Sequence, residues 1–173
     1  IDKRCHIGDW SKKVSLDVYG KKIGVLGLGA IGKGVAKRAE GFGMKVYGYD
    51  IYKDEKFINE NNIKFTTIEE IIKECDFISI HLPLTKETYH LIDKKMFKLA
   101  KNNLIIVNTA RGGIVDEEDL YEALQSGEIY GAGVDVFEEE PAGNSKLLKL
   151  ENVVVGSHCS ASSVGAVDKM SMM

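Results

Sequence analysis

The chain has 173 residues, which is enough for one domain with a sizeable hydrophobic core. Its residues are 44% hydrophobic and 28% charged, as in soluble globular proteins, and its net charge of −3 gives no electrostatic reason to expect nucleic acid or an anionic membrane as a partner. No stretch approaches the roughly 20 apolar residues that a membrane span requires. The three cysteines are far apart and form no CxxC motif, which is typical of reduced thiols, so we expect a cytoplasmic protein.

Both ends of the chain are expected to continue into a longer protein. The chain begins with Ile1 rather than Met, and it stops inside a helix that the pattern predicts over residues 163–173. Residues 1–14 mix apolar and charged side chains. They are expected to be the end of a helix that arrives from elsewhere, with Trp10 as a packing residue.

The stretch that follows carries a glycine motif. An apolar run over residues 23–26 is typical of a strand that is buried on both faces. Gly27, Gly29 and Gly32 come next, with the GxGxxG spacing. In dinucleotide-binding folds the first glycine permits a tight turn, the second lets the backbone approach a pyrophosphate, and the third lets the helix pack closely on the strand.

A helix is expected directly after this motif, because apolar residues recur at helical intervals and charged residues take the other side. The side chains expected to face inward are those of Ile31, Val35, Ala39 and Phe42. Gly41 and Gly43 can end the helix. The backbone N–H groups of its first turn, at Ala30 and Ile31, lie at the positive end of the helix dipole and offer a site for an anion.

An acidic residue completes the pattern. A second apolar run, over residues 46–49, stops at Asp50. A carboxylate at this position accepts hydrogen bonds from the adenosine ribose hydroxyls, and its charge repels a 2′-phosphate. The order of strand, glycine turn, helix, strand and acid therefore predicts NAD rather than NADP as the cofactor. The structural alternative is a helix start rich in glycine that binds nothing.

The rest of the chain predicts a doubly wound (Rossmann) α/β fold with a mostly parallel sheet of about seven strands. Five more strands are expected, over residues 63–65, 76–82, 104–107, 131–136 and 153–155. Helices are expected over residues 53–62, after Thr67, and over residues 116–126. Because ligands lie at the carboxyl edge of such sheets, the residues that follow the fourth strand are expected to line the adenosine site. These residues are Leu82, Pro83 and Thr88.

Four polar residues also follow strands, namely Arg111, Asp135, Glu140 and His158. An arginine can bind a carboxylate bidentately, a histidine can exchange a proton near neutral pH, and a carboxylate beside the histidine favours its charged form. Arg111 could instead form a surface ion pair. Glu140 is the third of three glutamates before a proline, and a solvated acidic turn is the default interpretation for the other two, Glu138 and Glu139. His158 next to Cys159 could suggest a thiol nucleophile or a metal site, but no further ligands occur at suitable spacing, so no metal is expected.

The motifs HLPLTKET, NTARGGIVDEEDLYEAL, GVDVFEEEP and NVVVGSH, in this order behind GLGAIG, resemble the cofactor domain of the D-isomer-specific 2-hydroxyacid dehydrogenases. The resemblance implies that Arg111 binds the substrate carboxylate and keto oxygen. It also implies that His158 is the acid/base and that Glu140 is its partner.

The same resemblance implies further cofactor contacts. Asp135 would hold the nicotinamide carboxamide, and Thr109 and Ala110 would line the nicotinamide ribose; Arg111 and His158 would also contact the cofactor. The chain departs from the family pattern at two positions, because Ser157 and Ser160 replace the usual proline before the histidine and the usual glycine after it. These replacements put the rigidity of the loop in question.

Members of this family have two domains, and the resemblance implies that the substrate domain is missing here. Residues 15–160 are then the NAD-binding domain, and residues 1–14 and 161–173 are connectors to the missing domain. The expected reaction is hydride transfer between a D-2-hydroxy acid and its 2-oxo acid, in a homodimer formed through the cofactor domain. Two alternatives stay open: an NAD(H)-sensing transcriptional corepressor of the same fold, and a domain that only binds nucleotide. Glu140 argues against formate, since formate dehydrogenases of this family have glutamine there.

Overall fold

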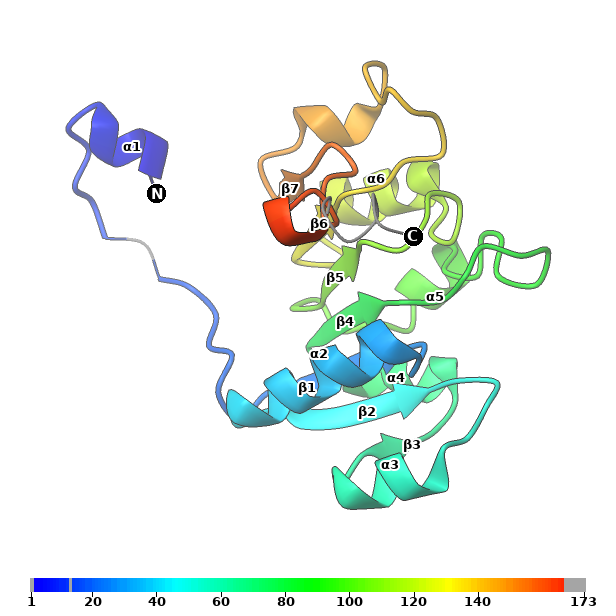
Figure 1. Cartoon of the computed structure of the whole chain (residues 1–173). Coiled ribbons are helices and arrows are strands. Elements are labelled where there is room, and N and C mark those ends of the chain that lie inside the picture. The colour runs from blue at the N-terminus through cyan, green and yellow to red at the C-terminus, as the bar shows by residue number, and fades with distance from the viewer. Residues whose placement is uncertain (1, 13, 167–173) are drawn as a thin grey trace.

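Seven strands form one sheet in the computed structural model, which describes residues 2–12 and 14–166 (Figure 1). The strand order is β3-β2-β1-β4-β5-β6-β7, and every neighbouring pair is parallel. The strands are β1 (Lys22–Leu26), β2 (Lys45–Tyr49), β3 (Lys64–Phe65), β4 (Phe77–Ile80), β5 (Ile105–Asn108), β6 (Gly131–Val134) and β7 (Val153–Val155). The predicted doubly wound sheet of about seven strands is therefore confirmed, with all strands parallel.

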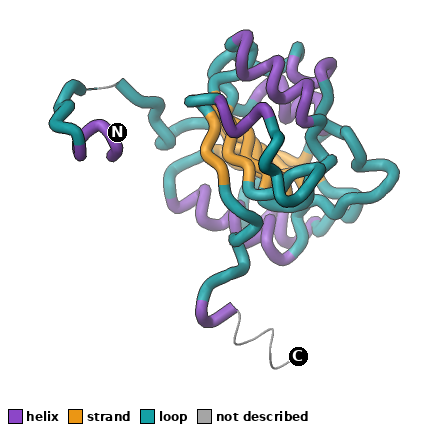
Figure 2. The backbone as a smooth tube through the Cα atoms, turned by 90° about the horizontal axis from the view of Figure 1, so that it is seen from above, coloured by secondary structure: helices purple, strands orange, loops and turns teal. Residues whose placement is uncertain are grey.

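Helices cover both faces of the sheet, as the view from above shows (Figure 2). The helices are α1 (Asp2–His6), α2 (Ala30–Gly41), α3 (Glu55–Glu60), α4 (Ile68–Glu74), α5 (Lys94–Phe97), α6 (Glu117–Ser126) and the 3₁₀ helix η1 (Lys146–Lys149). One buried apolar cluster unites α2 and α3 with β1 and β2, and a larger one unites α4, α5 and α6 with the central strands. A sheet buried on two sides explains why its strands are continuous apolar runs.

The strand order reverses between β1 and β4, which are hydrogen-bonded neighbours. The chain therefore continues from β1 toward the outer strand β3 and from β4 toward the outer strand β7. Connections that diverge in this way open a crevice at the carboxyl ends of the two strands, where ligands bind in open α/β sheets. This crevice lies beside the glycine turn, since that turn directly follows β1.

The inward face of α2 differs from the prediction. Ile31 and Phe42 are 71% and 65% exposed, whereas Gly32, Ala36 and Ala39 are buried. The cause is the close approach of α2 to the sheet: a Cβ atom at Gly32 would lie 1.8 Å from the carbonyl oxygen of Gly27. Only small side chains fit between α2 and the sheet at this distance. Ile31 and Phe42, which were predicted to face inward, therefore lie on the exposed side.

The ends of two other helices form as their sequences predict. The Thr67 hydroxyl accepts a hydrogen bond from the Glu70 backbone N–H at 3.3 Å and caps α4. Asp116 caps α6 in the same way, through the Asp119 N–H at 3.0 Å. Gly127 ends α6 with a φ of +75°, a left-handed conformation that glycine adopts without strain.

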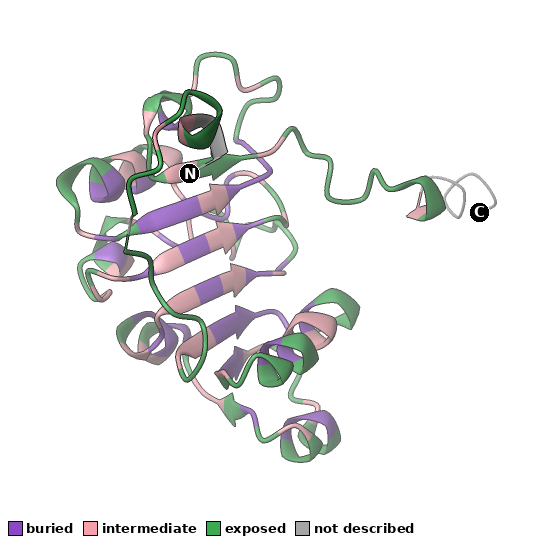
Figure 3. Cartoon of the chain, turned by 90° about the vertical axis from the view of Figure 1, so that its left-hand side faces the viewer, coloured by how far each residue is buried: buried purple, intermediate pink, exposed green. Residues whose placement is uncertain are grey.

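The first residues lie apart from the sheet and are mostly exposed (Figures 1 and 3). The predicted N-terminal helix is shorter than expected, because α1 ends at His6 and Gly8 follows with a φ of +82°. Trp10 is 81% exposed, so its predicted packing role is wrong for this structure. Of the predicted helix over residues 163–173, residues 167–173 lie outside the described part of the chain. Within residues 2–12 and 14–166, no helix is both long and apolar enough to cross a lipid bilayer.

Candidate active site

The glycine turn between β1 and α2 has the conformation that its spacing predicts. Gly27 has a φ of +98°, and a Cβ atom there would lie 2.6 Å from the backbone oxygen of His81 on the neighbouring loop. At Gly29 a Cβ atom would meet nothing within 4 Å, so the backbone borders open space. Gly29 also begins α2 without a side-chain cap. The first N–H groups of the helix therefore remain available to an anion, which fits a cofactor pyrophosphate.

Asp50 lies at the end of β2 and is tied to the glycine turn. Its Oδ2 atom accepts a hydrogen bond from the Leu28 N–H at 2.6 Å, and its Oδ1 atom accepts one from the Tyr52 N–H at 2.9 Å. The two bonds hold the carboxylate beside the turn that would bind the pyrophosphate. This is the position that a residue contacting the adenosine ribose requires.

A groove of about 990 Å³ runs along the carboxyl ends of β1, β4 and β5. Its lining residues are Ile31, His81, Leu82, Pro83, Leu84, Thr109, Ala110, Arg111, His158, Ser160 and Ala161. The structure thus brings together seven of the predicted site residues: Ile31, Leu82, Pro83, Thr109, Ala110, Arg111 and His158. The volume lies at the upper end of the roughly 300–1,000 Å³ that ligand pockets usually have.

Arg111 has an exposed guanidinium group on this groove. Its Nη1 atom donates to the carbonyl oxygen of Ala110 at 2.7 Å, and no carboxylate among the described residues forms an ion pair with it. The interpretation of Arg111 as part of a surface ion pair is therefore wrong for the described chain. The remaining N–H donors are free to bind a carboxylate ligand bidentately.

Asn108 positions the Arg111 loop, and the sequence analysis did not identify it. Its side chain is only 5% exposed; it accepts from the Ala110 N–H at 3.1 Å and donates to the Arg111 carbonyl at 2.9 Å. A buried asparagine that satisfies loop backbone groups on both sides fixes the path of the loop. The available signal was its place as the first residue of NTARG, directly at the end of an apolar strand.

His158 and Glu140 form a hydrogen-bonded pair. The distance between His158 Nδ1 and Glu140 Oε2 is 2.8 Å, and both side chains are about half exposed. The bond from His158, assisted by the Phe137 N–H at 3.1 Å, lowers the pKa of Glu140, so the carboxyl group stays ionised. Since Nδ1 is occupied, Nε2 is the ring nitrogen that can exchange a proton with a ligand.

The arrangement of glycine turn, Asp50, Arg111 and the His158–Glu140 pair agrees with a family comparison. The family model described as "D-isomer specific 2-hydroxyacid dehydrogenase, NAD binding domain" matches residues 1–160. The chain belongs to this family. The predicted cofactor, NAD, is confirmed by this match.

The chain is also similar to individual reductases and dehydrogenases. A glyoxylate reductase of Pyrococcus horikoshii is 44% identical over 98% of the chain and 53% of its own length, and a hydroxypyruvate reductase of Thermotoga maritima is 46% identical over 92% of the chain and 53% of its own length. The crystal structure of a D-lactate dehydrogenase of Aquifex aeolicus complexed with NAD and lactic acid superposes with a TM-score of 0.91, at 33% identity over 98% of the chain and 56% of that protein. The chain spans about half the length of these relatives.

Asp135 occupies a different position from the other site residues of this 2-hydroxyacid dehydrogenase domain. It is 8% exposed and does not line the groove. Its carboxylate accepts hydrogen bonds from the Ser160 hydroxyl, from the Ser160 N–H at 3.0 Å and from the Cys159 N–H at 3.2 Å. The bond from the Ser160 hydroxyl is the main reason why the pKa of Asp135 is lowered, although partial burial acts in the opposite direction.

Thr88 lies elsewhere than the sequence suggested, and His81 is a further residue of the groove. Thr88 does not line the groove of this dehydrogenase domain; its hydroxyl donates to the Pro83 carbonyl and accepts from the Thr85 N–H, both at 2.7 Å, and so closes the loop after β4. His81 does line the groove, and its Nε2 atom is 2.9 Å from the Ser79 hydroxyl. Burial lowers the pKa of His81, which favours the neutral ring. Among residues 2–12 and 14–166, no group of three or more His, Cys, Asp and Glu side chains could hold a metal ion.

Proposed function

We propose that this chain is the cofactor domain of an NAD-dependent D-2-hydroxyacid dehydrogenase, which interconverts a D-2-hydroxy acid and its 2-oxo acid. One observation carries the proposal: an unpaired guanidinium, a histidine paired with a carboxylate, and the glycine turn lie at the same edge of one sheet. These groups supply a substrate anchor, an acid/base and a cofactor site. A corepressor function has no comparable support, since the relatives described above are reductases and dehydrogenases by name.

The chemistry assigns each of the three polar residues a role. Arg111 binds the carboxylate of the 2-oxo acid through its free N–H donors and orients the keto oxygen. His158 donates the Nε2 proton to that oxygen as it becomes an alkoxide, and Glu140 keeps Nδ1 protonated and the ring in place. When bound, the reduced cofactor supplies the hydride to the keto carbon.

The cofactor contacts extend along the same edge. The residues of the glycine turn, namely Gly27, Gly29, Ala30, Ile31 and Gly32, receive the pyrophosphate. Asp50 binds the adenosine ribose and repels a 2′-phosphate. Leu82 and Pro83 form the wall beside the adenosine, and Thr88 supports it by closing the loop that carries them. Thr109, Ala110 and Asp135 serve the nicotinamide end.

The proposal includes a larger assembly. The chain spans about half of its relatives, which supports a separate substrate domain joined to residues 15–160 through residues 1–14 and 161–173. We also propose that the protein is a cytoplasmic homodimer that binds neither nucleic acid nor a membrane. The net charge of −3 supports the absence of such partners, and the free thiols of Cys5, Cys75 and Cys159 support a cytoplasmic location. Light scattering of the purified complete polypeptide tests the homodimer, and a monomeric mass contradicts it.

The substrate is a short 2-oxo acid. The relatives named glyoxylate reductase and hydroxypyruvate reductase make these two acids the first candidates, with pyruvate and 3-phosphohydroxypyruvate as the comparison compounds. The decisive assay follows NADH oxidation by the complete natural polypeptide that contains these residues, with each acid in turn.

Two results separate the possibilities. We expect NADH binding and turnover with at least one acid from the complete polypeptide, and weak NADH binding with little or no turnover from the 173 residues alone. If the complete polypeptide binds NADH without oxidising it in the presence of any of these acids, the domain is a nucleotide-binding module. If it binds neither NADH nor NAD, the proposed function is wrong.

A further inference from the structure

Ser160 lies on the surface of the groove, whereas the carboxylate of Asp135, to which it is hydrogen-bonded, does not. Ser160 lines the groove together with Arg111 and His158, and Asp135 is almost fully buried and is absent from the groove surface. The Ser160 hydroxyl donates to Asp135 Oδ2, and its backbone N–H donates to the same oxygen at 3.0 Å. A ligand that approaches from the groove therefore meets the serine before it reaches the aspartate.

The hydrogen bonds of these two residues can be counted. Asp135 Oδ2 accepts two hydrogen bonds from Ser160, and Oδ1 accepts the Cys159 N–H at 3.2 Å and the Cys159 thiol at 3.9 Å. A carboxylate has about four acceptor positions, so all four are filled from the loop itself. A serine hydroxyl has one donor and two acceptor lone pairs. With its proton directed at Asp135, the oxygen of Ser160 can only accept further hydrogen bonds.

The charge of Asp135 makes this oxygen a better acceptor. A hydroxyl that donates to an ionised carboxylate is polarised, and hydrogen bonds in such a chain strengthen one another. Asp135 stays ionised because the Ser160 hydroxyl itself lowers the pKa of the carboxyl group. Ser160 and Asp135 therefore form a two-residue acceptor whose outer atom is the serine oxygen.

We propose that Ser160 is the cofactor-binding residue that accepts a hydrogen bond from the amino group of the nicotinamide carboxamide, and that Asp135 acts through it. The proposal rests on the proposed function, because it assumes that NAD(H) occupies the groove. It assigns to the serine the direct contact that the family resemblance assigns to the aspartate. The same loop holds His158, whose backbone N–H donates to the Asp135 carbonyl at 2.8 Å, so the contact would lie next to the acid/base.

Substitutions of Ser160 distinguish this role from simple support of the loop. Ser160→Ala leaves a methyl group over Asp135 and no acceptor at the surface, so NADH affinity should fall about tenfold. Ser160→Thr keeps the hydroxyl and should bind NADH as the wild type does. Ser160→Gly removes the cover, so that the carboxamide can reach Asp135 directly, and affinity should be close to wild type. If Ser160 only supports the loop, the opposite order of NADH affinities is expected, with Ser160→Gly weaker than Ser160→Ala.

The measurement is a fluorescence titration of NADH into the complete natural polypeptide that contains these residues. Ser162→Ala is the matched control, because Ser162 is exposed on the same loop and its side chain forms no hydrogen bond with the described residues. A second titration uses reduced 3-acetylpyridine adenine dinucleotide, in which a methyl group replaces the amino group of the carboxamide. Wild type should bind this analogue about tenfold more weakly than NADH, and Ser160→Ala should weaken it no further.

Three results overturn the inference. The first is that Ser160→Ala binds NADH as tightly as Ser162→Ala does. The second is that Ser160→Gly binds NADH more weakly than Ser160→Ala does. The third is that Ser160→Ala loses affinity for NADH and for the acetylpyridine analogue by the same factor. A variant that has lost its fold is recognised by circular dichroism. If Ser160→Ala has lost its fold, the NADH affinity of Ser160→Gly decides the question: an affinity close to wild type supports the inference, and a large loss overturns it. If the wild type binds neither NADH nor the analogue, the proposed function fails, whereas unchanged NADH binding in Ser160→Ala refutes only the role of the serine.

Discussion

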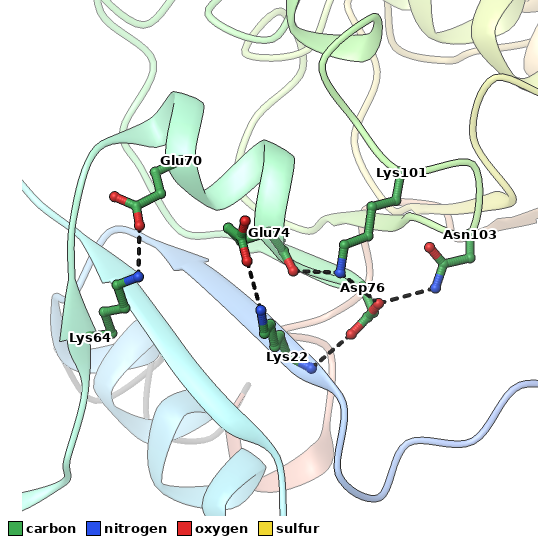
Figure 4. A network of polar contacts seen from close by, with 7 residues as sticks. All are labelled: Lys22, Lys64, Glu70, Glu74, Asp76, Lys101 and Asn103. Carbon is green, nitrogen blue, oxygen red and sulfur yellow. Dashed lines mark hydrogen bonds and ion pairs between the residues drawn. The ribbon is translucent and has the colours of Figure 1, made fainter.

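The two edges of the sheet use polar residues in opposite ways. At the amino edge, side chains from β1, α4 and the segments before β4 and β5 form a network of hydrogen bonds (Figure 4). At the carboxyl edge, the side chains of Arg111 and His158 each form one hydrogen bond with the described residues and keep other nitrogen atoms available. The first arrangement stabilises the fold, and the second leaves binding capacity for a ligand.

Asp76 is the centre of the amino-edge network. Its carboxylate accepts hydrogen bonds from the Lys22 backbone N–H at 2.9 Å, from Lys101 Nζ at 3.1 Å and from Asn103 Nδ2 at 3.1 Å, and Lys101 also donates to the Glu74 carbonyl (Figure 4). Burial raises the pKa of Asp76, but these hydrogen bonds and the charge of Lys101 outweigh it and leave the pKa lowered. The network joins the amino ends of three adjacent strands.

The comparison shows how a parallel sheet separates stability from activity. Strand starts and strand ends lie on opposite edges, so a change at one edge need not disturb the other. We therefore expect substitutions at the amino edge to lower stability without changing cofactor affinity, and substitutions at the carboxyl edge to lower cofactor affinity or turnover with at most a small change in stability.

His158→Gln should have the largest effect. The variant removes the group that exchanges a proton, so kcat should fall about 10²- to 10⁴-fold with the preferred 2-oxo acid. Because the His158 side chain is half exposed, the unfolding temperature should stay close to that of wild type. Steady-state kinetics of the complete polypeptide and thermal unfolding measure the two quantities. A large loss of stability with little loss of kcat contradicts the separation.

Asp76→Ala should have the next largest effect, on stability. It leaves three donors without their acceptor, so the free energy of unfolding should fall by about 2 kcal/mol. This corresponds to a decrease of roughly 4–8 °C in unfolding temperature for a chain of this size. Lys64→Ala, which breaks the exposed Lys64–Glu70 ion pair of the same region, is the control and should cost less than about 1 kcal/mol. An NADH affinity that falls in Asp76→Ala would show that the two edges are coupled.

Asp50→Asn tests the charge at the adenosine end. The amide has only one acceptor oxygen, so it can keep the hydrogen bond from the Leu28 N–H or the one from the Tyr52 N–H but not both, and it no longer repels a 2′-phosphate. NADPH affinity relative to NADH should therefore rise about tenfold. Fluorescence titrations with both cofactors measure the ratio, and Asp17→Asn, at an exposed position of the N-terminal segment, is the control. An unchanged ratio means that another group excludes the phosphate.

The smallest effect concerns Glu140 and pH. A carboxyl group whose pKa is lowered by folding stabilises the native state above its unfolded pKa, and this contribution is lost as the pH falls through the folded pKa. The bond from His158 lowers the pKa of Glu140 from the ordinary value of 4.5. Glu140→Gln should therefore be less stable than wild type at pH 7, and the difference should shrink as the pH falls through the lowered folded-state pKa of Glu140.

Urea unfolding between pH 7 and pH 3.5 measures this difference. Glu139→Gln is the matched control, since Glu139 lies on the same turn, is exposed, and has no hydrogen-bond or ion-pair partner among the described residues. Its stability should follow that of wild type at every pH. A difference between wild type and Glu140→Gln that stays the same over this whole pH range contradicts the assignment to the ionised carboxylate.

Local patterns predicted most of the fold but not the inward faces of its segments. The glycine spacing, the start of a helix after Thr67 and the apolar strands depend on neighbours in sequence, and the structure confirms them. Ile31 and Trp10 were assigned as inward-facing because they are large and apolar. Hydrophobicity alone cannot report how closely a helix approaches a sheet, or which side chains a partner surface would cover.

The amino-acid sequence by itself determined the order of strands and helices, the glycine turn, the acid at the end of β2 and, through the family motifs, the cofactor. Only the tertiary structure decided which polar groups share the groove: Asp135 is covered by Ser160, and Thr88 closes its own loop instead of lining the groove. The two kinds of feature depend on contacts over different distances along the chain. A turn or a cap depends on dihedral angles and neighbours a few residues apart, whereas access to a ligand depends on how loops from distant parts of the chain pack over one another.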